Sequence, residues 1–175
     1  LRRAGARVQY LCADVRDPAA FPGVIERIYR EHGRIDGGIH GAGVIEDRRI
    51  EDKTPESFDR VFDTKADGAF ILSRHLRLDS LRFLFFFSSV ACLGNAGQSD
   101  YAAANGAMNA LARDLDGRTP GRVGALLWGP WESAGMASEE VRRRFRDMGV
   151  QIIAPRAGRR RFVEELLRGR KGEVE

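Results

Sequence analysis

The chain has 175 residues, of which 43% are hydrophobic and 31% are charged, and its formal net charge is +4. This length and balance are typical of one soluble globular domain, and no apolar stretch approaches the ~18 residues that a membrane-spanning helix needs. No signal-peptide pattern is present, so we expect a cytoplasmic protein without membrane contacts. The two cysteines lack metal-ligand spacing, and we expect no bound metal.

Basic residues crowd into two stretches, "RRRFR" (142–146) and "RAGRRRF" (156–162). Their arginines alternate with apolar residues at helical spacing, which indicates the solvated faces of two amphipathic helices. No array of stacking aromatic residues accompanies them. We therefore predict no nucleic-acid partner.

Strand and helix patterns alternate along the chain. Strands are expected at 6–15, 35–43, 81–89 and 122–131, and helices at 21–33, 55–76, 99–117, about 137–148 and 156–168. Thr54 followed by Pro55 marks the start of the second helix. Strands that alternate with helices of this length form right-handed βαβ units around a parallel sheet. The predicted fold class is α/β, with a Rossmann-like, doubly wound parallel sheet.

The glycine pattern of a dinucleotide site is missing. Such a fold normally opens with a strand, a Gly-rich turn and a helix that holds the pyrophosphate. No G-x-G-x-x-G motif occurs, and "GGIHGAG" (37–43) lies in mid-chain. Either the protein binds no dinucleotide, or the sequence is a fragment. A fragment would lack the first two strands with the Gly-rich loop, and also the last strand.

Hydroxyl, phenol and amide side chains follow the apolar strand at 81–89. Ser88 and Ser89 end this strand, Tyr101 follows on the next helix, and Asn105 is one turn beyond Tyr101 on the same helical face. A phenol has a pKa near ~10, so it needs a nearby cation to exchange protons near neutrality. Lys65 on the preceding helix is the obvious cation, and Gly68 beside it leaves room for another group to approach. Together these residues indicate a catalytic site.

These segments resemble the ketoreductase domain of modular polyketide synthases and polyunsaturated fatty acid synthases, a branch of the short-chain dehydrogenase/reductase superfamily. The resemblance rests on "HGAGVIEDRRIEDKTPESFDRVFDTKADGAFILSRHL", "FFFSSVACLGNAGQSDYAAAN" and "LLWGPW". It implies that residues 1–175 are the carboxyl-terminal portion of one such domain. It also implies NADPH-dependent reduction of a β-ketoacyl thioester to the β-hydroxyacyl thioester. The implied partners are an acyl carrier protein, whose phosphopantetheine carries the β-ketoacyl chain, and the other domains of the same synthase.

The resemblance implies the catalytic roles. Tyr101 would donate a proton to the carbonyl oxygen, and Lys65 would lower the pKa of the phenol and touch the nicotinamide ribose. A serine would hydrogen-bond the carbonyl oxygen, and Asn105 would hold a water in the proton relay. Ser88 has the family spacing to Tyr101, whereas Ser89 has the family position within the serine pair. We favour Ser89, because a strand end fixes direction more rigidly than a loop fixes length.

Further residues are implied by the same resemblance. For the cofactor they are Asp14, Val15, His40, Gly41, Ala42, Gly43 and Pro130, together with Lys65 and Tyr101. For the substrate they are Asp47, Ser88, Trp131 and Met136. Segment 132–150 matches the substrate lid. "IED" (45–47) resembles the Leu-Asp-Asp marker of ketoreductases that form the D-configured (B-type) hydroxyl.

Two other functions stay open. The first is a non-catalytic reductase-fold segment that serves as a structural or docking module of a megasynthase, although Tyr101 and Lys65 are both retained. The second is a stand-alone short-chain dehydrogenase, against which "LLWGPW" and Asn105 argue. A serine hydrolase is disfavoured, because no histidine lies where a serine-centred triad would need it. We expect the isolated fragment to bind its cofactor poorly and to be inactive.

Overall fold

The computed structural model describes residues 1–133, 135–136 and 138–172, apart from the side chain of Arg144. Its centre is a parallel sheet in the order β1-β2-β3, formed by Gly37–His40, Phe83–Ser89 and Arg122–Trp128. Both neighbouring pairs are parallel, and helices connect them. The predicted α/β fold with a parallel sheet is confirmed.

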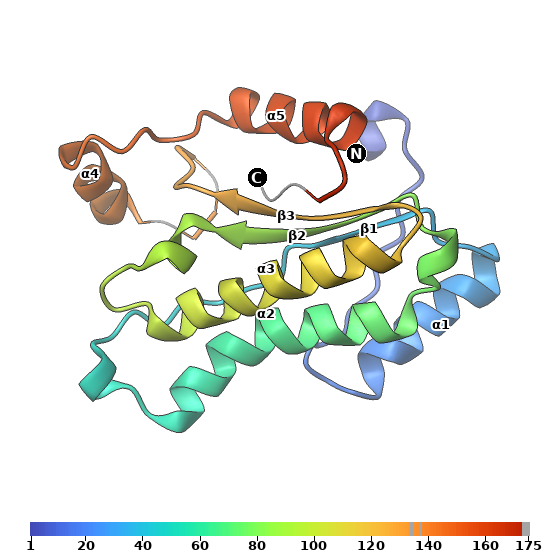
Figure 1. The fold of residues 1–175 in the computed structure, drawn as a ribbon, viewed down its shortest axis with the longest axis horizontal. Coiled ribbons are helices and arrows are strands. Elements are labelled where there is room, and N and C mark those ends of the chain that lie inside the picture. Colours follow the sequence, from blue (N-terminus) through green and yellow to red (C-terminus); the bar gives the residue numbers. More distant parts are fainter. Residues whose placement is uncertain (134, 137, 173–175) are drawn as a thin grey trace.

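The helices cover both faces of the sheet. Their bounds are α1 Ala20–His32, α2 Pro55–His75, α3 Ser99–Arg118, α4 Glu139–Asp147 and α5 Pro155–Arg168. Figure 1 shows α2 and α3 on one face and α5 on the other, while α4 lies beyond the end of the sheet. In the part of the chain that the structure describes, no helix has both the length and the apolar content of a membrane span.

The start of α2 follows the sequence signal. Thr54 is the N-cap, its hydroxyl oxygen accepts a hydrogen bond from the Ser57 N–H at 3.2 Å, and Pro55 takes the first helical position. The short 3₁₀ turn η2 (Ile50–Asp52) precedes this cap, and another, η4 (Val90–Leu93), follows β2. These two turns lead into the helices that carry Lys65 and Tyr101.

The predicted strand at 6–15 is wrong. None of its residues belongs to a sheet, and among the described residues β1 pairs with β2 alone. A strand depends on hydrogen bonds to a neighbouring strand, and this segment has none. Side chains hold it instead, as where Gln9 Nε2 donates to Glu31 Oε2 of α1 at 3.1 Å. The third and fourth predicted strands end close to their expected positions, although β3 stops at Trp128 rather than 131.

The apolar core lies on both sides of β2. Leu84 and Phe86 pack with residues of α1, α2 and α3 in the main hydrophobic cluster. Phe85 and Phe87 contact Phe162 of α5, with ring centroids 5.8 and 5.6 Å apart. Burial on both faces explains why the strand is a continuous apolar run rather than an alternating one.

His40 fixes α2 to the end of β1. The ring is buried, and its Nε2 lies 3.0 Å from the carbonyl oxygen of Lys65. Burial lowers the pKa of His40 to about 4, so the ring is neutral near pH 7. Gly68 permits the contact, because a Cβ at that position would lie 2.7 Å from His40 Cε1. The space that Gly68 leaves beside Lys65 is therefore occupied by the His40 ring.

Replacing Gly68 tests this packing. Alanine favours a helix over glycine by ~1 kcal/mol, yet we expect Gly68→Ala to lower the free energy of unfolding by about 1–3 kcal/mol, because the new methyl group displaces His40. Gly106→Ala in α3 is the matched control, since open space surrounds that position and only the propensity gain applies. Urea unfolding of both variants measures the difference. Equal stabilisation by the two substitutions would contradict the packing argument.

Candidate active site

A cavity of about 420 Å³ lies at the carboxyl end of the sheet. This is the edge where open α/β sheets bind ligands. The cavity lies between the end of β2, the start of α3, the turns after β1 and β3, and the segment that carries α4. Among the residues predicted from the sequence, the ones that line it are Gly41, Gly43, Asp47, Lys65, Ser88, Ser89, Tyr101, Pro130, Trp131 and Met136.

Lys65 is buried against the end of β2. The residue is 3% exposed, and its Nζ donates to the carbonyl oxygen of Phe87 at 2.9 Å. The same nitrogen lies 5.1 Å from the centroid of the Tyr101 ring, within range of a cation–π contact. Burial lowers the pKa of Lys65 from 10.5 to about 8. Its ammonium group thus exchanges protons nearer to neutrality than an exposed lysine does.

Tyr101 lies in the first turn of α3 and is 9% exposed. Burial raises the pKa of the phenol, while the neighbouring side chains of Asn105 and Ser89 act in the opposite direction. The resemblance implied that Lys65 would lower the pKa of Tyr101, but the net shift is upward. The lysine faces the Tyr101 ring and donates its hydrogen bond to the Phe87 carbonyl oxygen rather than to the phenol. The phenol therefore stays protonated near pH 7, which is the form of a proton donor.

The two serines at the end of β2 have different partners. Ser88 is buried, and its hydroxyl oxygen has no hydrogen-bond partner. The Ser89 hydroxyl oxygen accepts the Ala91 N–H at 3.1 Å and caps η4. Of the two, Ser89 is the serine whose side chain acts to lower the pKa of Tyr101. The choice of Ser89 as catalytic serine stays a prediction.

Asn105 lies behind Tyr101 rather than in the cavity wall. It is fully buried, and its Nδ2 donates to the carbonyl oxygen of Tyr101 at 2.7 Å. Its Oδ1 has no partner in the structure. An unpaired buried acceptor beside the tyrosine suits a bound water, although the relay itself stays a prediction.

Several predicted cofactor residues do not line the cavity. Asp14 is exposed and forms an ion pair with Arg16 at 2.7 Å, and this arginine lowers the pKa of Asp14 to about 2. Val15 faces α2, because a Cβ built on Gly68 of that helix would lie only 3.3 Å from the Cβ of Val15. The His40 ring is bonded to Lys65, and Ala42 is absent from the cavity wall. Cofactor contacts of these residues stay predictions.

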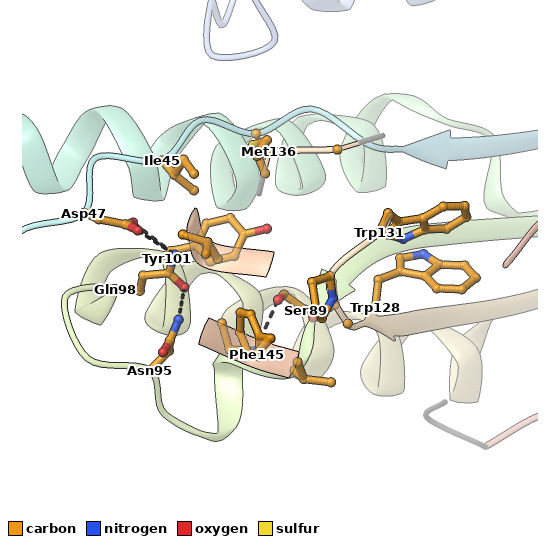
Figure 2. A pocket seen from close by; sticks show the side chains of 18 of the residues that line it. Ile45, Asp47, Ser89, Asn95, Gln98, Tyr101, Trp128, Trp131, Met136 and Phe145 are labelled. Carbon is orange, nitrogen blue, oxygen red and sulfur yellow. Dashed lines mark hydrogen bonds between the residues drawn. The ribbon is translucent and has the colours of Figure 1, made fainter. Parts of the chain in front are cut away.

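The cavity has a polar rim that the sequence does not reveal. Gln98 Nε2 donates to both carboxylate oxygens of Asp47, at 3.0 and 3.1 Å, and Asn95 Nδ2 donates to Gln98 Oε1 at 2.8 Å. Figure 2 shows this chain of contacts on one side of Tyr101 and the two tryptophans on the other. Asp47 and Gln98 are 51 positions apart, so no local pattern could join them.

An aromatic and aliphatic wall completes the cavity. Trp128 and Trp131 pack edge to face, with ring centroids 5.1 Å apart, and Trp128 Nε1 has no hydrogen-bond partner. The segment predicted as a lid contributes Met136, together with Val141, Phe145 and Met148 from or next to α4. The last three stand at helical spacing in the sequence, which by itself indicates an amphipathic helix and not a cavity wall. Residues 134 and 137 of the segment lie outside the described residues.

The sequence model of the KR domain family matches residues 1–133. The chain belongs to this family. The KR, or ketoreductase, domains of polyketide and polyunsaturated fatty acid synthases form a branch of the short-chain dehydrogenase/reductase superfamily, as the resemblance predicted. Within the described part of the chain, no cluster of three or more His, Cys, Asp or Glu side chains is placed to hold a metal ion.

Relatives of the chain are large synthases. It is 36% identical over 167 residues to a component of the polyunsaturated fatty acid synthase of Thraustochytrium sp., in a match that covers 94% of this chain and 6% of that protein. It is 37% identical over 158 residues to a phenolphthiocerol synthesis polyketide synthase of Mycobacterium marinum, with 89% and 7% covered. The chain thus spans a small part of these proteins.

Solved ketoreductase structures share the fold. The ketoreductase of the first phoslactomycin module from Streptomyces sp. HK803 superposes with a TM-score of 0.91 at 31% identity, over 99% of this chain and 40% of that one. A ketoreductase domain of the bacillaene assembly line gives 0.87 at 36%, over 97% and 43%. A short-chain dehydrogenase from Burkholderia cenocepacia, solved with NADP, gives 0.78 at 20% and supports the fold alone.

The pH dependence of stability tests the burial of Lys65. Between about pH 8 and pH 10.5 the unfolded chain holds the Lys65 proton more tightly than the folded chain does, so stability rises with pH across that window. Lys65→Met removes this contribution. We expect the wild type to gain about 3 kcal/mol relative to Lys65→Met over the window, measured by thermal unfolding at a series of pH values. A constant difference between the two proteins would show that the ammonium group is not desolvated.

Proposed function

We propose that this ketoreductase domain reduces a β-ketoacyl thioester to the β-hydroxyacyl thioester, with NADPH as the hydride donor. The substrate would be carried on the phosphopantetheine of an acyl carrier protein within the same synthase. The observation that supports the proposal most is that Lys65, Ser89 and Tyr101 line the same cavity. Membership of the ketoreductase family supports it as well.

The residues at the cavity fit a nicotinamide cofactor. A Cβ at Gly43 would lie 3.0 Å from Lys65 Cε and 3.5 Å from Nζ, so a side chain at position 43 would crowd the lysine at the cavity wall. Ser88 contributes a buried hydroxyl oxygen without a partner to the cavity wall. Gly41, Gly43, Lys65, Tyr101 and Pro130 would hold the group. When bound, it would supply the hydride that adds to the carbonyl carbon.

The side chains at the cavity would transfer the proton and stabilise the charge on the carbonyl oxygen. Tyr101, kept protonated by burial, donates its proton to the carbonyl oxygen as the carbon is reduced. Ser89 donates a hydrogen bond to the same oxygen and stabilises the charge that develops there. Lys65 and a water held at Asn105 Oδ1 then return a proton to the phenolate.

Removal of the Tyr101 hydroxyl is the direct test of this proposal. In the complete polypeptide that carries this chain, we expect Tyr101→Phe to lower the rate of NADPH consumption with a β-ketoacyl thioester surrogate by ~100-fold or more. NADPH binding, followed by fluorescence, should persist.

Tyr29→Phe is the matched control for this test. Tyr29 in α1 is also 9% exposed, but its hydroxyl accepts the Arg77 N–H at 2.8 Å far from the cavity. We expect this variant to keep the wild-type rate. If the folded wild type binds NADPH and does not turn over, the reduction proposal is wrong and a structural module is the better account.

We further propose that the product is the D-configured (B-type) β-hydroxyacyl group. Asp47, the residue retained from the marker of that class, lines the cavity and is held by Gln98. Chiral chromatography of the product should show the D form in excess, and Asp47→Ala should reduce that excess. An excess of the L form from the wild type would refute the proposal.

A further inference from the structure

A buried ion pair lies beside the cavity, outside the residues that carry the proposed chemistry. Lys53 Nζ lies 2.7 Å from Asp100 Oδ2, and the two side chains are 5% and 1% exposed. The partners are 47 residues apart in the sequence. A charged pair in such a place costs desolvation energy, so a contribution to stability is a weak explanation for it. Its contacts indicate what else it does.

Asp100 contacts the backbone of the proposed proton donor. Its Oδ1 accepts the Tyr101 N–H at 2.8 Å, while its Oδ2 holds Lys53. The N–H groups in the first turn of a helix have no partner within the helix, and the N-cap residue Gln98 makes no side-chain cap bond. Asp100 therefore fixes the backbone of Tyr101 at the point where α3 begins.

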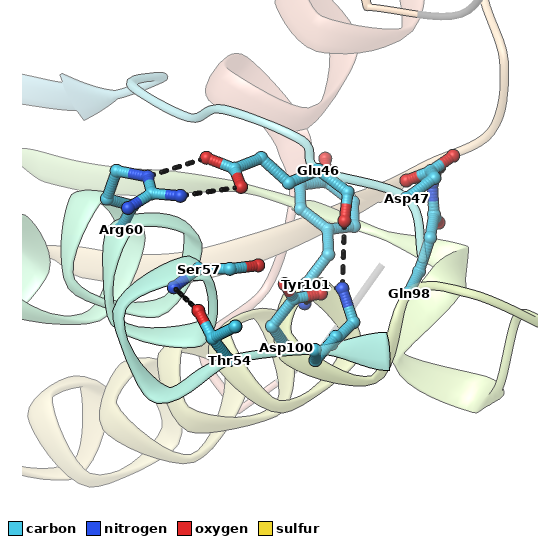
Figure 3. A network of polar contacts seen from close by, with 9 residues as sticks. Glu46, Asp47, Thr54, Ser57, Arg60, Gln98, Asp100 and Tyr101 are labelled. Atoms are coloured by element: carbon cyan, nitrogen blue, oxygen red, sulfur yellow. Dashed lines mark hydrogen bonds and ion pairs between the residues drawn. The ribbon is translucent and has the colours of Figure 1, made fainter. Parts of the chain in front are cut away.

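Lys53 connects this helix start to the loop that carries Asp47. Its Nζ also donates to the carbonyl oxygen of Glu46 at 2.8 Å. The Glu46 carboxylate in turn accepts two hydrogen bonds from Arg60 of α2, at 2.7 and 2.9 Å. Figure 3 shows Glu46 between Arg60 on one side and the start of α3 on the other. One ammonium group thus joins the Asp47 loop to the Tyr101 helix.

We propose that Lys53 and Asp100 are positioning residues of the reaction: Asp100 sets the place of Tyr101, and Lys53 sets the Asp47 loop relative to it. This inference rests on the proposed function. A displacement of about 1 Å at a reacting group costs up to ~100-fold in rate, so the pair influences turnover without touching the substrate. Facial selectivity depends on the same arrangement, because Asp47 and Tyr101 line one cavity.

Two double variants separate positioning from stability. Lys53→Met/Asp100→Asn removes both charges and keeps an oxygen acceptor for the Tyr101 N–H. Lys53→Met/Asp100→Leu removes the charges and the acceptor. Neither leaves a lone buried charge, and replacement of a whole buried pair is often neutral for stability. The two proteins therefore differ in the acceptor for the Tyr101 N–H.

The kinetic comparison uses the complete polypeptide with NADPH and a β-ketoacyl thioester. We expect the Asn variant to keep kcat within about threefold of the wild type but to give a less enantiopure product. We expect the Leu variant to show kcat about tenfold lower than the Asn variant, with KM changed less than about threefold. Equal kcat in the two variants would overturn the role of Asp100. Wild-type enantiomeric purity in the Asn variant would overturn the role of Lys53.

A second buried pair provides the control. Arg122 and Glu165 form an ion pair at the opposite end of the sheet, with side chains 11% and 3% exposed. Arg122→Met/Glu165→Leu should change the melting temperature at most, and leave kcat per folded molecule and product purity as in the wild type. A fall in kcat in this control equal to that of the Leu variant would show that any buried pair has the effect.

Hydrogen exchange gives a readout that needs no turnover. The amide of Tyr101 should exchange faster in the Leu variant than in the Asn variant, measured by mass spectrometry on a peptide that spans residues 99–103. Equal exchange would refute the contact between Asp100 and Tyr101 even if the enzyme were inactive. An inactive wild type with the expected exchange difference would instead refute the proposed function alone.

Discussion

Burial of β2 on both faces is the constraint on which the rest of the structure depends. Its aromatic side chains pack against α5 on one face and against the α1–α3 layer on the other. Burial of each such side chain stabilises the fold by roughly 1.5–3 kcal/mol, and a slip of one residue would exchange the two faces. The register of β2 is therefore fixed, and with it the positions of the residues at its carboxyl end. These residues are Phe87, whose carbonyl oxygen accepts a hydrogen bond from Lys65, and the two serines that line the cavity.

The same desolvation acts on the two ionisable groups of the cavity in opposite directions. It lowers the pKa of Lys65 and raises that of Tyr101, so both neutral forms are favoured. A neutral tyrosine is a proton donor, and a lysine with a pKa of about 8 exchanges protons near neutral pH. The arrangement suits a site that delivers a proton to a reduced carbonyl. A site that needed a phenolate would require the opposite shift.

Elements that depend on local sequence patterns could be predicted from the sequence. Contacts between segments that are distant in the sequence could not. Periodicity and the Thr54 cap predicted the helices, and the apolar run predicted β2. The segment at 6–15 has the pattern of a strand, but pattern alone does not supply a partner. The hydrogen-bond contact between the His40 ring and the Lys65 carbonyl joins positions 25 apart, so no local pattern could reveal it. The Lys53–Asp100 pair joins positions 47 apart, and no local signal marks it.

We propose that the hydride and the proton both reach the carbonyl group of the substrate at the cavity of Lys65, Ser89 and Tyr101. The measurement that tests this follows deuterium from NADPH with both nicotinamide C4 hydrogens replaced by deuterium into the product, in the complete polypeptide with a β-ketoacyl thioester. We predict that the deuterium is found on the β-carbon of the hydroxyacyl product. A hydroxyacyl product without the label, or none at all from folded protein that binds NADPH, would contradict the claim.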